Sequence, residues 1–137
     1  MRRNRPEPAA ARVIAALLSA VAGCASLPAC RDGEQAVVIE TLYFGTATPD
    51  GVVAAADWRD FLARELTPRF PQGLTVTEAD GQWRGADGRI VHEATHVLTL
   101  IGTDADDAAI RALAGAYRTR FRQEAVLRVR QPACRVD

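Results

Sequence analysis

The sequence of 137 residues lacks the motifs that identify the common enzyme classes. It contains no G-x-S-x-G nucleophile elbow, no phosphate-binding loop and no dinucleotide-binding fingerprint. It has no Cys-x-x-Cys pair, so a dithiol redox centre is not expected. The length suits one domain and is too short for two. These absences leave no set of catalytic residues to assign from motifs.

Long apolar runs are also absent. The run from Val13 to Gly23 is uncharged and has 11 residues, whereas a membrane-spanning helix needs about 20. It follows a positive amino-terminal region, which carries Arg2, Arg3, Arg5 and Arg12. A short apolar core behind basic residues is typical of a signal peptide.

The end of this run resembles the lipobox of bacterial lipoproteins. Val21, Ala22 and Gly23 precede Cys24, which would carry the lipid and become the new amino terminus. We expect residues 1–23 to be a lipoprotein signal peptide and the acyl chains on Cys24 to anchor the protein in the membrane. Because Ala25 and not Asp follows, delivery to the periplasmic side of the outer membrane is favoured. The alternative is ordinary secretion, since the small-x-small cleavage rule is satisfied at residues 20–22 as well.

Lysine is absent, and arginine provides all of the positive side chains except two histidines. After removal of residues 1–23, 13 arginines would face 16 acidic residues, a net charge near −3. Such a domain has no electrostatic reason to bind nucleic acid or an anionic lipid surface. The partners that we expect are the membrane, through the lipid, and either a second copy of the chain or another envelope protein.

Two cysteines remain near the ends of the mature chain, Cys30 and Cys134. In an oxidising periplasm such a pair indicates a disulfide, although two unpaired buried thiols are the alternative. Closing a loop of about 100 residues would stabilise the fold by about 4–5 kcal/mol in the chain-entropy model.

Hydrophobic periodicity predicts four strands and two helices in the order β-α-β-β-α-β. The strands are expected at 36–44, 74–83, 95–101 and 125–129, and the helices at 58–66 and 110–121. This order predicts an α+β, ferredoxin-like sandwich, in which both helices cover one face of a four-stranded antiparallel sheet. Residues 24–34 would form a lipidated tether and residues 35–137 the domain. The first and last strands are neighbours in that fold, which would bring Cys30 beside Cys134.

One enzyme-like motif is present, H-E-x-x-H, formed by His92, Glu93 and His96. In zinc peptidases a helix places both imidazoles on one side of the metal, and the glutamate acts as general base. The β-branched residues of segment 95–101 predict a strand here instead. On a strand the two histidines would lie about 13 Å apart, too far for one zinc ion. We therefore expect no metal and no other cofactor, with a zinc-dependent hydrolase as the alternative.

Four separated motifs resemble a bacterial family known as domain of unknown function 3574, which includes many candidate lipoproteins. They are E-T-L-Y-F-G at 40–45, T-P-R-F-P-x-G-L-T-V at 67–76, G-Q-W-R at 81–84, and E-A-V-L-R-V at 124–129 with P-A-C at 132–134. The resemblance implies no activity. In the family, basic residues usually stand at the positions of His92 and His96, whereas the acid at Glu93 is shared.

The leading functional hypothesis is a non-enzymatic binding or envelope-interaction domain. The sheet face opposite the helices would be open, and Thr75, Thr77, Thr99, Tyr43 and Arg128 are expected on it. The candidate binding residues are Tyr43, Trp83, Arg69, Glu93 and Arg128. A secreted periplasmic domain that binds a small ligand is a further alternative.

Overall fold

The computed structural model describes residues 30–102 and 107–136. Cys24, the expected signal peptide at 1–23 and most of the expected tether lie outside the described residues. The elements in chain order are β1 (Gln35–Gly45), β2 (Ala47–Thr48), β3 (Gly51–Val52), α1 (Ala55–Phe61), the π-helical turn η2 (Leu62–Leu66), β4 (Thr75–Arg84), β5 (Ile90–Gly102), α2 (Asp107–Phe121) and β6 (Leu127–Arg135).

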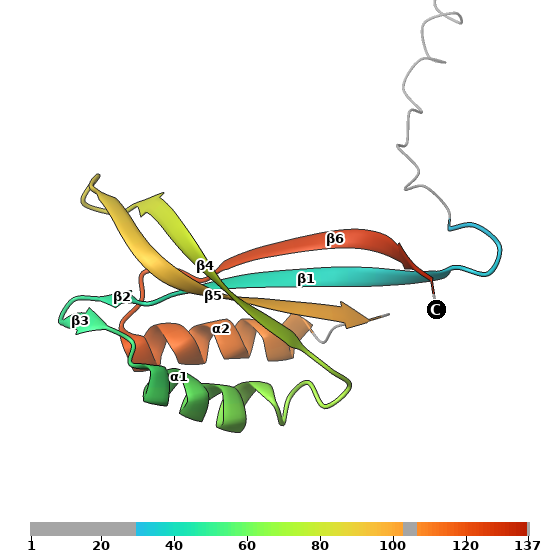
Figure 1. Ribbon diagram of the computed structural model, residues 1–137, viewed down its shortest axis with the longest axis horizontal. Coiled ribbons are helices and arrows are strands. Elements are labelled where there is room, and N and C mark those ends of the chain that lie inside the picture. The colour runs from blue at the N-terminus through green and yellow to red at the C-terminus, as the bar shows by residue number, and fades with distance from the viewer. Residues whose placement is uncertain (1–29, 103–106, 137) are drawn as a thin grey trace, which may run out of the picture.

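Four strands form one antiparallel sheet in the order β4-β5-β1-β6, and both helices lie against the same face of it (Figure 1). The short strands β2 and β3 form a separate two-stranded ribbon. The expected ferredoxin-like α+β sandwich is confirmed. None of the helices in the described residues is both long and apolar enough to cross a membrane.

The pairing register assigns every strand residue to one of two sheet faces, because directly opposite residues share a face and successive residues alternate. Leu42 pairs with Leu98 on the face that the helices cover. Tyr43 pairs with Val97 on the other face. We call these the helix face and the open face.

The core lies between the helix face and the two helices. It is centred on aromatic rings from three elements: Phe44 of β1, Trp58 and Phe61 of α1, and Tyr117 of α2. The rings of Phe44 and Tyr117 meet edge to face, with centroids 4.8 Å apart. Each fully buried side chain of this size contributes about 1.5–3 kcal/mol, so this layer is the main source of the stability of the fold.

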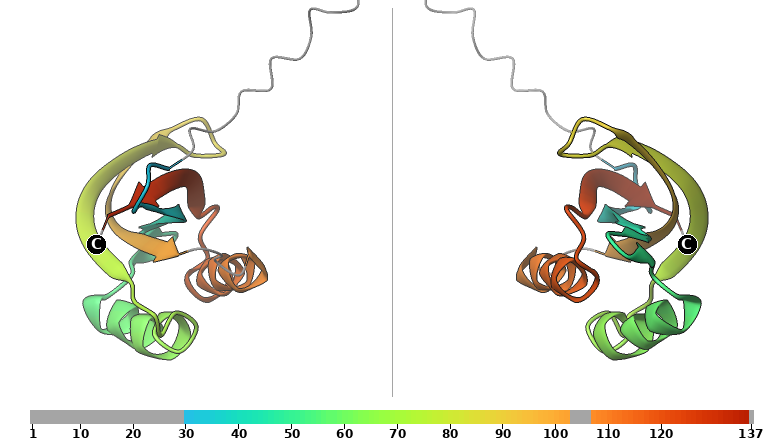
Figure 2. Two further views of the ribbon diagram at one scale, coloured as in Figure 1. Left: turned by 90° about the vertical axis from the view of Figure 1, so that its right-hand side faces the viewer. Right: turned by 90° about the vertical axis from the view of Figure 1, so that its left-hand side faces the viewer.

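The sheet is strongly curled. Figure 2 shows β4 and β5 arching around β1 and β6, so the open face is concave near the β4–β5 turn. A right-handed twist is general in sheets. Here the long antiparallel hairpin, paired from Thr75 with Thr99 to Arg84 with Ile90, extends it beyond the helices.

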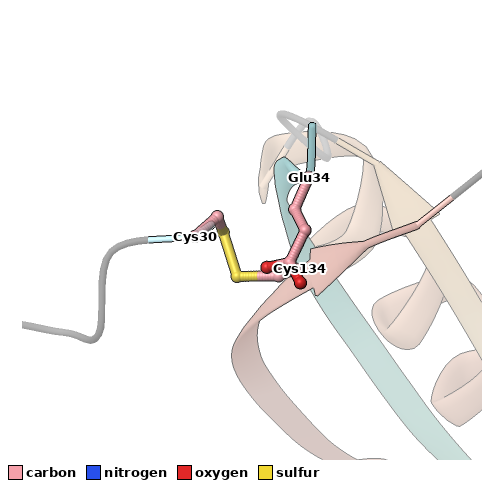
Figure 3. A group of neighbouring side chains, drawn as sticks. All are labelled: Cys30, Glu34 and Cys134. Atoms are coloured by element: carbon pink, nitrogen blue, oxygen red, sulfur yellow. A yellow bond between two sulfur atoms is a disulfide. The ribbon is translucent and has the colours of Figure 1, made fainter. Parts of the chain in front are cut away.

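The disulfide between Cys30 and Cys134 is confirmed, with a Cα–Cα distance of 5.6 Å. It joins the chain before β1 to the end of β6, where Ala36 pairs with Cys134 (Figure 3). The carboxylate of Glu34 lies within 4.8 Å of both sulfur atoms. The sulfurs are bonded to one another, so they offer no thiolate to a metal ion.

Two strands differ from their expected bounds by more than one residue at an end. β5 begins at Ile90, five residues before the expected start, because its pairing with β4 continues to the turn. β6 begins at Leu127 and continues through Pro132 to Arg135. Pro132 is tolerated because β6 is an edge strand, whose outer side needs no N–H donor.

Candidate binding site on the open face of the sheet

A pocket of about 360 Å³ lies on the concave open face. Its floor consists of residues with small side chains on three strands: Gly45, Ala79, Gly81 and Thr95. Gly45 and Ala79 both pair with Thr95, so these positions are adjacent across β1, β5 and β4. Two glycines and an alanine around Thr95 leave a hollow in the sheet surface.

Larger side chains form the walls. Tyr43 of β1, Trp83 of β4 and Leu127 of β6 stand around the floor, and Gln123 and Ala125 line the side next to the end of α2. Tyr43 is 38% exposed and Leu127 is 60% exposed, so the walls keep apolar surface in contact with water. Exposed apolar surface beside a hollow is typical of a ligand site.

The carboxylate of Glu93 is held at the pocket by two hydrogen bonds. The indole Nε1–H of Trp83 donates to Oε1 at 2.6 Å, and the backbone N–H of Ala47 donates to Oε2 at 2.7 Å. Gly45 is required for this arrangement, since a Cβ there would lie 2.3 Å from Oε1 of Glu93. The glycine therefore makes room for the carboxylate as well as for the pocket.

The chain at residues 45–47 is held in place from the helix side. The hydroxyl of Tyr117 donates to the carbonyl of Gly45 at 2.9 Å, and the side-chain amide of Gln123 donates to the carbonyl of Ala47 at 2.6 Å. Burial, and secondarily the charge of Glu93, raise the pKa of Tyr117 above its usual value, so the phenol stays protonated and keeps donating. The floor of the pocket is thus fixed before any ligand arrives.

The charge at the pocket is negative. Within the described residues its lining contains Glu93 and Asp80 but no arginine or histidine, and Asp80, which pairs with Ala94, belongs to the helix face, so Glu93 provides the charge on the open face. Among the described residues Glu93 has no ion pair. The two donors that hold Glu93 are neutral N–H groups, so its charge is solvated but not compensated.

Residues 39–136 match the family of proteins of unknown function DUF3574. This chain belongs to the DUF3574 family. Among curated proteins, none matches its sequence.

Two solved structures with the same fold as this DUF3574 chain are those of a phage SAM lyase. The structure in complex with S-methyl-5'-thioadenosine has a TM-score of 0.55 and 16% identity, and the apo structure has 0.54 and 18%. The matches cover 82% of this chain and 96% and 97% of those chains. At this identity the similarity is one of fold.

Three of the five residues that sequence reasoning singled out meet at the pocket, namely Tyr43, Trp83 and Glu93. Arg69 does not line it. Arg69 follows η2, where its guanidinium donates to the backbone carbonyl and the carboxylate of Glu65. These contacts give Arg69 a local structural role at the end of η2.

The expectation that Arg128 lies on the open face is wrong. Arg128 pairs with Leu42, which places it on the helix face, whereas Thr75, Thr77, Thr99 and Tyr43 do share the open face. Its guanidinium binds the fully buried carboxylate of Glu40 with two hydrogen bonds of 2.8 and 2.7 Å, and it also donates to Asp107 at the start of α2. The hydrogen bond to Glu40 is the main reason why the pKa of Arg128 is raised, and the bond from Arg128 lowers the pKa of Asp107.

The H-E-x-x-H motif lies on strand β5. Alternation places His92 and His96 on the helix face and Glu93 on the open face, so Glu93 is not positioned to act on water at a metal between the histidines. His96 stacks on Trp58, with ring centroids 4.0 Å apart and planes 6° apart. Burial lowers the pKa of His96, partly offset by Glu78. The motif therefore does not have the geometry of a zinc peptidase.

Sequence reasoning missed the residues that make the pocket hollow. Gly45 and Gly81 stand at the end of one family motif and the start of another. A glycine within a strand is itself a signal that another group approaches the backbone closely. Gln123 carried no comparable signal, because its role depends on where α2 ends.

Proposed function

We propose that this DUF3574 chain is a lipid-anchored protein of the bacterial envelope that binds a small organic ligand in the open-face pocket, without catalysing its conversion. The observation that carries the proposal is the pocket itself. It is mainly apolar, has aromatic walls and one oriented carboxylate, and at about 360 Å³ lies in the range of small-molecule sites.

Binding is favoured over catalysis because two polar groups of the site, Glu93 and Gln123, already have structural partners. Both oxygens of Glu93 accept hydrogen bonds, and the side-chain amide of Gln123 donates to the backbone. Groups held in this way are preorganised to orient a ligand. The phage SAM lyase solved with S-methyl-5'-thioadenosine supports, by analogy of fold alone, the use of this architecture for a small organic molecule.

The proposed anchor and the pocket are at opposite ends of β1. The disulfide lies where β1 begins and the pocket where it ends, and 11 residues of strand span about 33 Å. A lipid on Cys24 would therefore be attached next to the end of the domain that is remote from the pocket.

The anchor is tested by labelling cells with radioactive palmitate and separating membrane from soluble protein. We expect the full chain to be labelled and found in membranes, Cys24→Ala to lose the label, and the neighbouring control Ser26→Ala to keep it. An unlabelled, soluble wild-type protein would instead indicate ordinary secretion.

The pocket is tested with 5-fluorotryptophan and ¹⁹F NMR on the mature chain, because the protein has two tryptophans, Trp83 at the pocket and Trp58 in the core. The probes are choline, tyramine, glucose and S-methyl-5'-thioadenosine. We expect at least one to shift the Trp83 resonance but not the Trp58 resonance. Ala79→Phe fills the floor and should abolish the shift, whereas Thr77→Phe, two residues earlier on the same face, should not. A Trp83 resonance that no probe moves, or that moves equally in Ala79→Phe, contradicts the proposal.

A further inference from the structure

We propose that the ligand of the open-face pocket is an organic cation, an alkylammonium or sulfonium group for which Glu93 is the counter-ion. This inference rests on the proposed binding function and names the chemical class of its ligand. It starts from a charge that the protein leaves uncompensated.

The charged groups that line the pocket have one sign. Glu93 and Asp80 are both acidic, although 17 arginines occur in the chain, and because Asp80 pairs with Ala94 on the helix face, Glu93 provides the charge on the open face. The structure brings an arginine to the buried acid Glu40 and none, within the described residues, to Glu93. A half-buried carboxylate without a cationic partner favours the binding of a positive charge, since the attraction is stronger where water is partly excluded.

The carboxylate of Glu93 is also held ready for such a partner. An ionised carboxylate can accept about four hydrogen bonds, and Glu93 accepts two, from Trp83 and Ala47. These donors fix its orientation and leave acceptor capacity on both oxygens. The cost of ordering the side chain has therefore already been met in the free protein.

The walls suit an organic cation better than a bare metal ion. Tyr43 and Trp83 place aromatic rings at the pocket, and aromatic rings attract alkylammonium groups through their electron-rich faces. A divalent metal needs several oxygen or nitrogen ligands. Across residues 30–102 and 107–136, the group formed by the disulfide sulfurs and Glu34 is the sole close set of three ligand atoms from His, Cys, Asp or Glu side chains, and it is not at this pocket.

The inference is tested with a matched pair of probes, choline and 3,3-dimethyl-1-butanol, which have the same shape but differ in charge. Both are titrated against the mature wild-type chain while the ¹⁹F resonance of Trp83 is followed. We expect choline to bind at least about tenfold more tightly, and salt to weaken choline alone. This comparison needs no variant.

A variant assigns the effect to one carboxylate. Glu93→Gln should weaken choline binding about tenfold while leaving 3,3-dimethyl-1-butanol unchanged, and the control Asp80→Asn should change either probe less than threefold. The unchanged neutral probe shows that the pocket of Glu93→Gln is intact.

The outcomes separate this inference from the proposed function. Equal binding of the two probes, or tighter binding of the neutral one, overturns the cation while the pocket remains a binding site. If Glu93→Gln weakens both probes alike, Glu93 shapes the pocket and is not a counter-ion. If neither probe moves the Trp83 resonance but S-methyl-5'-thioadenosine does, the ligand is neutral. A resonance that nothing moves refutes both proposals.

Discussion

Two glutamates on opposite faces of one sheet have different partners. Glu40 on the helix face has no exposed surface, and Arg128 binds both of its oxygens while Arg130 approaches one of them at 3.3 Å. Glu93 on the open face is half-buried and is held by the neutral N–H groups of Trp83 and Ala47. The first carboxylate has two arginine partners, and the second has no cationic partner among the described residues.

The difference separates a carboxylate that stabilises the fold from one that we propose binds a ligand. A buried carboxylate that lacks a cation is strongly destabilising, so the Glu40 cluster has to be complete before anything binds. Its arginine also reaches Asp107 and so ties β6 to the start of α2. At Glu93 water can solvate the charge, and the incomplete pairing is tolerated. A ligand can therefore provide what the protein does not.

The largest expected effect on stability follows the substitution of Arg128, the main partner of Glu40. Arg128→Met leaves the buried Glu40 with Arg130 alone, 3.3 Å from one of its oxygens, and we expect a loss of about 3 kcal/mol in the free energy of unfolding. The measurement is urea denaturation of the oxidised protein. Arg130→Met, at a pair that is 53% exposed on the arginine side, should cost about 1 kcal/mol or less. Replacing both Glu40 and Arg128 by Met should recover most of the loss, because no unpaired charge is then buried. Equal costs for the two single arginine variants would show that Glu40 does not depend on Arg128.

A smaller effect is expected at Gly45. In Gly45→Ala the new Cβ would occupy the position of the Glu93 carboxylate, which must swing away and lose its bonds to Trp83 and Ala47. Two partly exposed hydrogen bonds are worth about 1–2 kcal/mol, and the gain from a less flexible unfolded chain offsets part of this. We expect a net loss of about 1 kcal/mol, again by urea denaturation.

The matched control for this substitution is Gly102→Ala on β5, where a Cβ meets nothing within 4 Å. It should be neutral or slightly stabilising. In a double-mutant cycle, Gly45→Ala should cost less when Glu93 is already alanine, because the displaced carboxylate is gone. If the two substitutions show no coupling energy, Gly45 does not make room for the Glu93 carboxylate and contributes only to the pocket floor.

The two glutamates also show what the sequence could reveal. Strand periodicity and element order were enough to predict the ferredoxin-like fold, and with it the meeting of Cys30 and Cys134. Face assignments were less secure, since one residue of register decides them. Arg128 was placed on the wrong face because it stands among alternating apolar residues, whereas its partner Glu40 lies 88 positions earlier in the chain. A lone acid inside the apolar run 36–44 was the available signal that a buried cation had to exist.

The pocket could be anticipated only in part. Tyr43, Trp83 and Glu93 were recognisable as candidates, but a hollow arises from side chains that are missing, at Gly45 and Gly81, on strands whose register the sequence does not state. The curl of the β4–β5 hairpin, which makes the open face concave, likewise depends on a pairing that extends to Ile90.

The smallest expected effect is a loss of stability at acidic pH that depends on His96, a polar side chain on the helix face. Its Nδ1 is buried on the helix face and has no hydrogen-bond partner among the described residues, and burial lowers its pKa. The unfolded chain therefore takes up a proton near the ordinary pKa of 6.5, while the folded protein resists it to lower pH. The stability from this residue is fully present above about pH 6.5 and is lost as the pH falls below that value.

The measurement is the midpoint of urea denaturation at about pH 7.5 and at about pH 5.5. The midpoint should fall less between these two pH values in His96→Phe, which keeps the stacking on Trp58, than in wild type. His92→Phe, four residues earlier on the same strand face but exposed, should keep the wild-type drop. If the drop survives in His96→Phe, acid sensitivity comes from the carboxylates, and the helix face holds its polar groups by ion pairing alone.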